Sequence, residues 1–232
     1  IEIVEFGAGS LRKVRILLKE KGLAFARRPN LARISQQGPA TPDHVIRTKR
    51  LPLLGRDLDD YVARYKDYFA EHAPRAKEPK TMLDPTPRVI LDPVWGLCTV
   101  GRTAKDAAIV RDIYDHTIDV ILRAEALDTR HGYQALSARD LFDMEYWDLE
   151  QAKLRKGGKP PVFTGEIALV TGAASGIGKA CVDALLSRGA AVIGLDIDPA
   201  VEALYDKPAF TGRRCDVTDA DQLAAALEQG VR

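Results

Sequence analysis

The sequence predicts an α/β protein whose C-terminal part is a truncated, doubly wound parallel sheet, preceded by a mixed α+β, mainly helical region. Three observations support this fold class. Apolar runs without polar alternation occur at 167–170 and 190–195, which is typical of strands buried on both faces of a parallel sheet. A glycine-rich turn separates the first run from a helical pattern. Between residues 57 and 154, apolar residues recur at helical spacing.

Composition excludes several function classes. The chain has 232 residues, and its 46% hydrophobic content is ordinary for a globular protein. A formal net charge of +1 gives no case for nucleic acid or a membrane as a partner. No apolar run approaches the roughly 20 residues that span a bilayer, and no signal peptide is visible. Cys98, Cys181 and Cys215 are unclustered, so we expect a reducing, cytoplasmic compartment.

Three helices are predicted in the first region, each with a capping residue at its start. Their ranges are about 57–72, 103–126 and 137–154. Asp57 can cap the first of them. Thr103 and Ser137 are each followed three residues later by an acid, Asp106 and Asp140, which resembles a capping box. In the third helix, Tyr146 and Trp147 are interpreted as core residues.

Other parts of this region are less regular. Residues 11–21 favour a short basic helix that Gly22 ends. Short strands are expected at 88–91 and 97–100 as a hairpin. Glycine and proline in the segment 156–161 forbid regular structure, so we place a domain boundary at about residue 160.

The turn after the first buried strand carries the strongest chemical signal. It reads Thr-Gly-Ala-Ala-Ser-Gly-Ile-Gly from Thr171 to Gly178, and a helix follows. Main-chain amides at a helix N-terminus have no partner inside the helix, and glycines let them approach a pyrophosphate. The alternative is a tight strand–helix connection without a ligand. The context of strand, turn, helix and second strand favours the dinucleotide-binding interpretation.

Asp196 ends the second buried strand, 18 residues after Gly178. An acid at this place accepts hydrogen bonds from the adenosine ribose hydroxyls and repels a 2′-phosphate, which favours NAD over NADP. A simple exposed turn residue is the alternative. A third strand at about 212–215 and a helix at 220–229 complete three β-α units, half of a Rossmann domain.

These residues carry a family resemblance. The segment from Thr171 to Gly178 resembles the glycine motif of short-chain dehydrogenases/reductases, Asp196 matches their ribose-binding acid, and Asp216-Val217 matches their adenine-contacting pair. The resemblance implies an oxidoreductase that binds a nicotinamide dinucleotide. It implies the cofactor-binding residues Gly172, Ser175, Gly176, Ile177, Gly178, Asp196, Ile197, Asp216 and Val217.

The resemblance supplies no catalytic residue. The family's Asn-Asn-Ala-Gly segment, its catalytic serine and its Tyr-x-x-x-Lys pair have no match in the 232 residues. Those groups carry the proton transfer that accompanies hydride movement. The chain also begins at Ile1 rather than Met. We therefore expect a truncated chain that is inactive by itself.

The first 160 residues resemble the middle of bifunctional proteins that join a class II aldolase to a short-chain dehydrogenase. The segments 41–49, 100–107 and 140–154 carry this resemblance. It implies rhamnulose-1-phosphate cleavage and lactaldehyde oxidation in the parent protein, with zinc held by histidines upstream of this chain and no metal site within it. The expected domains are 1–160, the C-terminal part of the aldolase-like region with linker helices, and 161–232, the N-terminal part of the NAD-binding domain.

Three functions stay open at this point. The first is an NAD-dependent oxidoreductase half acting on a small alcohol or aldehyde. The second is a non-catalytic dinucleotide-binding or assembly module, whose open sheet edge predicts a homo-oligomer or a partner. The third is sugar-phosphate binding by the first region, where His44 lies near Arg47 and Lys49. A histidine that stabilises its loop is the simpler interpretation of His44.

Overall fold

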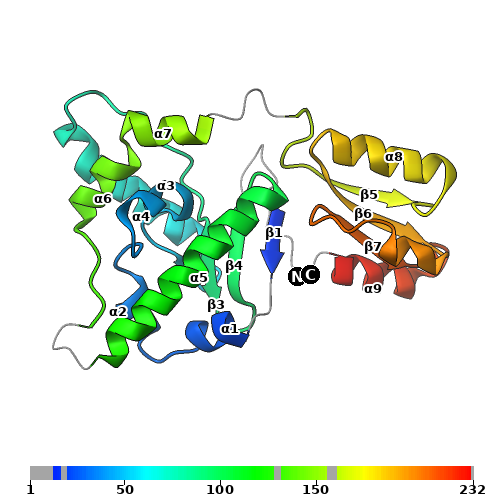
Figure 1. The fold of residues 1–232 in the computed structure, drawn as a ribbon, viewed down its shortest axis with the longest axis horizontal. Coiled ribbons are helices and arrows are strands. Elements are labelled where there is room, and N and C mark those ends of the chain that lie inside the picture. The colour runs from blue at the N-terminus through cyan, green and yellow to red at the C-terminus, as the bar shows by residue number, and fades with distance from the viewer. Residues whose placement is uncertain (1–12, 17–19, 128–131, 156–160, 231–232) are drawn as a thin grey trace. The chain divides into compact units, whose positions relative to one another are not determined.

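The computed structural model describes residues 13–16, 20–127, 132–155 and 161–230 (Figure 1). The chain divides into two compact units. One is made of residues 16–100 and 108–158, and the other of residues 159–232 together with 1–15 and 101–107. Each unit is described by itself. None of the described helices is both long enough and apolar enough to cross a membrane.

A four-stranded sheet has the strand order β1-β4-β3-β2. Its strands are β1 (Lys13–Ile16), β2 (Leu53–Leu54), β3 (Val89–Asp92) and β4 (Gly96–Gly101). β3 and β4 form the predicted antiparallel hairpin, with Ile90 opposite Cys98, and β2 joins β3 in parallel.

The helices of this region are mostly short. They are α1 (Glu20–Ala26), α2 (Leu31–Ser35), α3 (Val45–Thr48), α4 (Leu58–His72), α5 (Ala104–Ala126), α6 (Ala138–Glu145) and α7 (Asp148–Arg155), with the 3-10 turns η1 (Pro42–His44) and η2 (Ala73–Arg75). Apolar residues of α5, such as Tyr114 and Ile118, pack with Val89 and Leu91 of β3 in the main core. A second cluster joins α4 to α6 through aromatic rings, including Tyr68 and Phe142.

The predicted caps are confirmed. Asp57 accepts a hydrogen bond from the amide of Asp60 at 2.9 Å and opens α4. The Thr103 hydroxyl accepts from the Asp106 amide at 3.0 Å, as in a capping box. Ser137 caps α6 in the same way.

Two predictions for this region are wrong. The proposed helix over 11–21 contains strand β1, because residues 13–16 alternate polar and apolar side chains and pair as a strand. Gly22 does not end a helix but lies inside α1. A Cβ there would lie 2.8 Å from the Cβ of Leu97, so the glycine permits close packing on β4.

The helix expected over 137–154 is interrupted at Tyr146 and Trp147, between α6 and α7. The side-chain amide of Gln151 donates to the carbonyl of Glu145 at 2.6 Å, which satisfies an acceptor where the helix stops. Tyr146 is buried, as expected. Trp147 is 49% exposed, so its assignment to the core is wrong.

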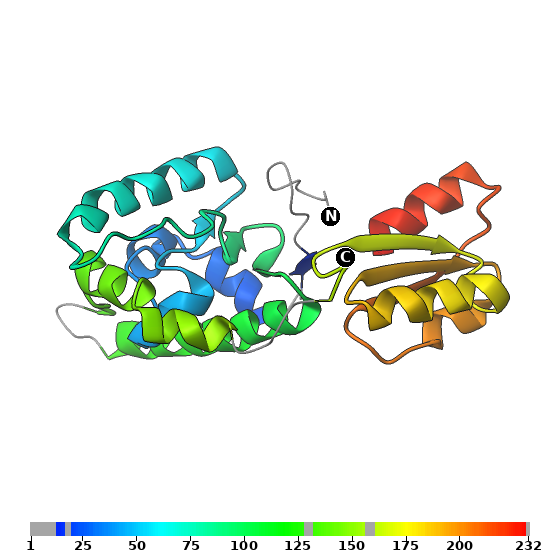
Figure 2. The ribbon, with the colours of Figure 1, turned by 90° about the horizontal axis from the view of Figure 1, so that it is seen from above.

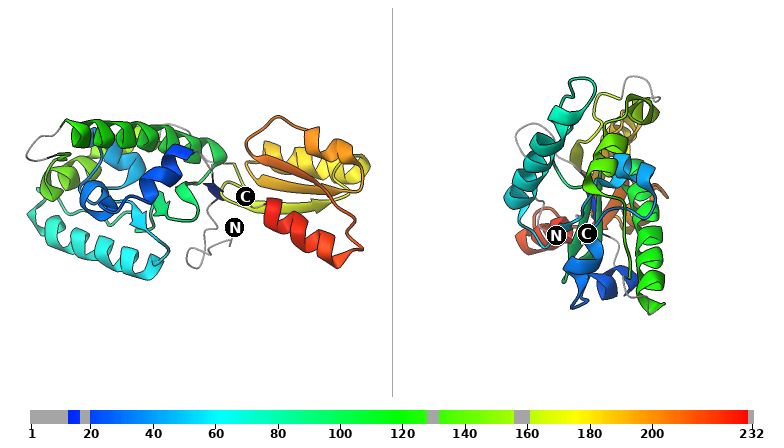
Figure 3. Two further views of the ribbon diagram at one scale, coloured as in Figure 1. Left: turned by 90° about the horizontal axis from the view of Figure 1, so that it is seen from below. Right: turned by 90° about the vertical axis from the view of Figure 1, so that its left-hand side faces the viewer.

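The C-terminal unit is the predicted parallel sheet with helices on both faces (Figures 1 and 2). The strand order is β5 (Ile167–Thr171), β6 (Ala191–Asp196) and β7 (Phe210–Arg214). Figure 3 also shows α8 (Gly176–Ser187) and α9 (Ala220–Gly230) on opposite sides of this sheet, and η3 (Pro199–Ala203) packs against β7.

Alternate residues of β6 enter two separate cores. Val192 packs with Val182 of α8, whereas Leu195 packs with Ala226 of α9. The prediction that β5 is buried on both faces is wrong, because Leu169 is 47% exposed while Leu195 is 0% exposed. β5 is an edge strand of the described sheet, and α9 packs on β6 and β7.

Candidate dinucleotide site

The turn between β5 and α8 requires glycine for two different reasons. Gly172 and Gly176 have φ values of +64° and +53°, the left-handed region that side chains disfavour. Gly178 is needed for space instead, because a Cβ there would lie 1.9 Å from the carbonyl oxygen of Gly172. The sequence therefore brings the start of α8 directly against the end of β5.

The first amides of α8 are unoccupied by protein groups. Ser175 is the N-cap residue, but its side chain forms no capping hydrogen bond. Lys179 is the first helical amide with a partner, the Ser175 carbonyl at 3.1 Å; within the described chain, the amides of Gly176, Ile177 and Gly178 have no acceptor. Ser175, Gly176 and Ile177 are exposed. Free donors at the positive end of a helix form a site for an anion such as a diphosphate.

Asp196 lies beside this turn at the end of β6. One carboxylate oxygen accepts from the Ala174 amide at 2.9 Å and the other from the Asp198 amide at 2.9 Å. The hydrogen bonds from Asp198 and Ala174 lower the pKa of Asp196 below its ordinary value. The carboxylate is therefore ionised and fixed in place, and its remaining lone pairs are available to ligand hydroxyls.

Asp216 follows the end of β7, the next strand. Its carboxylate accepts from the Thr218 amide at 3.0 Å and the Thr218 hydroxyl at 2.7 Å, and the Thr218 hydrogen bonds lower the Asp216 pKa. These bonds shape the loop that presents Val217. Three apolar side chains follow the strand ends and are exposed: Ile177 at 86%, Ile197 at 63% and Val217 at 45%.

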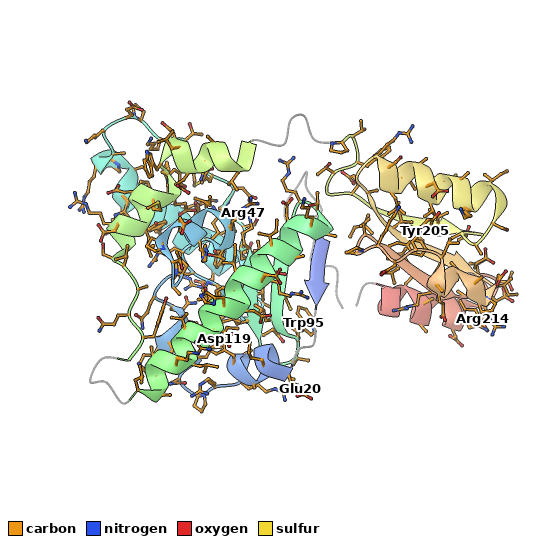
Figure 4. The ribbon with its side chains drawn as sticks, viewed as in Figure 1. Glu20, Arg47, Trp95, Asp119, Tyr205 and Arg214 are labelled. Carbon is orange, nitrogen blue, oxygen red and sulfur yellow. The ribbon has the colours of Figure 1, made fainter. Side chains whose placement is uncertain are left out.

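The nine residues expected from the sequence thus follow the carboxyl ends of three adjacent parallel strands or begin the helix after the first. That edge is where ligands bind in open α/β sheets. Arg214, labelled in Figure 4, was not among the expected residues. Its register partner across β6 and β7 is Asp196. Arg214 is exposed, and its Nε donates to the Ile197 carbonyl at 3.1 Å. In the sequence, the pair of adjacent basic residues at 213 and 214 is the one feature that points to it.

Of the basic residues considered around His44, Lys49 is engaged in a buried ion pair. Lys49 is only 5% exposed, and its ammonium group binds Glu145 and Tyr65 at 3.0 and 2.8 Å. His44 lies in η1 and is half-buried. Among residues the structure describes, no group of three His, Cys, Asp or Glu side chains is arranged to hold a metal ion.

Comparison with known families divides the chain in two. Residues 12–154 match the family described as "Aldolase class II, second domain", and residues 166–232 match "short chain dehydrogenase". The first match covers more than half of the chain. The two families are those whose resemblance was expected from the sequence.

Three similar curated proteins carry oxidoreductase or dehydrogenase in their names. An uncharacterized oxidoreductase of Bacillus subtilis, YuxG, is 26% identical over 89% of this chain, but the match covers 33% of that protein. A D-threitol dehydrogenase of Mycolicibacterium smegmatis is 43% identical over 28% of the chain and 27% of its own length. The oxidoreductase UcpA of Escherichia coli is 41% identical over 29% of the chain and 27% of its length. The chain thus spans about a third or less of each relative.

Proposed function

Since this chain belongs to the class II aldolase second-domain family and continues into a short-chain dehydrogenase segment, we propose that its parent protein is an NAD-dependent oxidoreductase fused to an aldolase. The single observation that carries the proposal is the row of unpaired amides from Gly176 to Gly178 beside the ionised Asp196. We also propose residues 1–160 as the end of the aldolase region with its linker helices, and 161–232 as the start of the NAD-binding domain.

Each residue of the site has a proposed role. The amides at the start of α8, with Gly172 and Ser175 shaping the turn, hold the pyrophosphate. Asp196 accepts hydrogen bonds from the adenosine ribose hydroxyls. The adenine is lined by Ile197, Asp216 and Val217, and Ile177 faces the nicotinamide side. NAD is favoured over NADP because the fixed negative charge of Asp196 repels a 2′-phosphate.

The reaction we propose is hydride transfer on a small alcohol or aldehyde. Lactaldehyde is the specific substrate that the family resemblance favours. When bound, the dinucleotide would accept the hydride from the substrate in oxidation and supply it in reduction, whereas the acid–base pair that moves the proton has no Tyr-x-x-x-Lys match in the sequence. We therefore expect no turnover by these 232 residues alone. The free cysteines Cys98, Cys181 and Cys215 support a reducing cytoplasm.

Titration of the chain with NADH and with NADPH, followed by the fluorescence of the reduced nicotinamide, tests the cofactor proposal. We expect Asp196→Ala to weaken NADH by about tenfold or more, the value of a lost hydrogen bond to a charged group. The affinity for NADPH should rise relative to the affinity for NADH. Asp206→Ala is the matched control, because Asp206 is an exposed acid of the same unit with no hydrogen-bond partner in the described part. Unchanged NADH affinity in Asp196→Ala would contradict the assignment.

The edge position of β5 favours a second candidate, an assembly module. Leu169 is exposed beside unpaired main-chain groups of an edge strand, which is a template for pairing with another chain. A homo-oligomer is the expected consequence. Light scattering tests it directly, and a monomer at all concentrations would count against an assembly role.

A further inference from the structure

A cavity lies within the aldolase-family unit, and none of its lining residues is assigned to the dinucleotide. Its volume is about 530 Å³, and its walls come from α4, α2 and the segment after α3. This volume falls in the range of small-molecule sites, roughly 300–1,000 Å³. Residues that line it include Gln36, Arg50, Tyr61, Arg64, Tyr68 and His72.

Arg50 brings a positive charge without a counter-ion to this cavity. Its guanidinium carbon lies 4.8 Å from the centroid of the Tyr68 ring. Its Nε is buried and unpaired, and across the described chain no carboxylate forms an ion pair with it. Arg64, on the same wall, is instead paired with Asp60 at 2.8 Å. A half-buried guanidinium is costly until an anion compensates it, and its planar fork suits a carboxylate or phosphate.

His72 adds an independent polar group beside the same ring. Its ring centroid lies 5.1 Å from that of Tyr68, and the residue is 6% exposed. Its Nδ1 is buried and has no hydrogen-bond partner among the described residues. Buried polar groups are normally paired, so an unpaired one in a cavity wall indicates a partner that the chain does not supply.

Tyr65, which lines the cavity, belongs to a buried hydrogen-bond network. The Tyr65 hydroxyl lies 2.8 Å from Lys49 Nζ, from a Glu145 oxygen and from the Tyr146 hydroxyl. Glu145 is 0% exposed, and its carboxylate is paired with Lys49 at 3.0 Å. Lys49 also has a φ of +65°, a strained conformation that only a well-determined surrounding retains. Because Lys49 and Arg64 are each paired with a carboxylate, Arg50 is the lining cation for which the described chain shows no ion pair.

Two exposed carboxylates, Asp67 and Glu71, complete the lining. They would repel a bare anion but accept hydrogen bonds from hydroxyl groups. A ligand that carries both an oxyanion and hydroxyls satisfies Arg50 and these acids together. We propose that this cavity is a binding site for a small hydroxylated organic anion, whose carboxylate or phosphate is held by Arg50 over the Tyr68 ring.

The test uses the full chain and three probes: glycerol 3-phosphate, glycerate and neutral glycerol. Side-chain 15N NMR follows the Arg50 Nε–H resonance, and calorimetry gives the affinity. We expect glycerol 3-phosphate or glycerate to shift the Arg50 resonance, the stronger of the two identifying the phosphate or carboxylate source. Glycerol should leave it unchanged.

Arg50→Gln should weaken the better anion by about tenfold or more. Arg75→Gln is the matched control, because this substitution makes the same change of net charge. Arg75 is exposed and does not line the cavity. Equal weakening in both variants, or no Arg50 shift with either anion in the unmodified chain, would overturn the proposal. NADH affinity is measured separately, so failure here leaves the dinucleotide site untouched.

Discussion

Gly178→Ala places one methyl group where the carbonyl oxygen of Gly172 lies only 1.9 Å away, with Thr171 oxygen at 2.9 Å. Both neighbours are backbone, which cannot rotate aside as a flexible side chain can. The turn that holds Gly176 to Gly178 must therefore move. Overpacking of this kind costs about 1–3 kcal/mol.

The same substitution also has a stabilising effect that opposes this cost. Inside a helix, alanine is favoured over glycine by about 1 kcal/mol. The overpacking cost less this gain leaves an expected net loss of up to about 2 kcal/mol. We expect NADH affinity to fall by at least about tenfold, because the amides no longer converge on one anion.

The assay has to report on the C-terminal unit alone. Both tryptophans, Trp95 and Trp147, lie in the other unit, so intrinsic tryptophan fluorescence is unsuitable. Hydrogen exchange of peptides from 166–187, with NADH fluorescence titration, measures the local stability and the affinity. Gly55→Ala is a control without crowding, because Gly55 has open space around it and lies in the first unit; its φ of +71° confines any backbone strain to that unit. A more stable Gly178→Ala chain with intact NADH binding would refute the reasoning.

Three further predictions concern other parts of the chain. Lys49→Met leaves the buried Glu145 carboxylate uncompensated, so the free energy of unfolding in urea, followed by tryptophan fluorescence, should fall by about 3–5 kcal/mol. The double variant with Glu145→Leu should recover most of this loss. A small loss in Lys49→Met alone would argue against the ion pair. Leu195→Ala should lower the stability of the C-terminal unit by about 2–5 kcal/mol, because Leu195 is 0% exposed. Leu169 is 47% exposed, so Leu169→Ala should lower it by less than about 1 kcal/mol. Equal losses of stability, measured by hydrogen exchange, would mean that β5 is covered on both faces. The Asp198 and Ala174 amides lower the pKa of Asp196 below 3.8, so its stabilising contribution is present at neutral pH and is lost as the pH falls through the lowered value; a carboxyl 13C titration that gives an ordinary or raised pKa would contradict this.

Local signals predicted much of the fold. The caps at Asp57, Thr103 and Ser137 could be predicted from the sequence, because the side-chain oxygen and the amide that donates to it lie within one turn. The glycine turn was readable for the same reason, since strand, turn and helix follow each other along the chain. The site residues gather at one sheet edge because parallel strands place their carboxyl ends together.

The failures depend on partners distant in sequence. The strand at 13–16 carries only four alternating residues, too few to outweigh a helical pattern until β4 is beside it. Leu169 belongs to an unbroken apolar run, yet its exposure depends on which element covers that face of β5. Arg50 and His72 are 22 residues apart in sequence, and only the fold places both against Tyr68.

The most direct measurement is an 15N NMR titration of the chain with NADH. The amide resonances of Gly176, Ile177 and Gly178 should move together as the ligand saturates, because these are the donors without a protein partner. If those three amides stay in place while NADH binds, or if NADH does not bind at all, the start of α8 is not a diphosphate site.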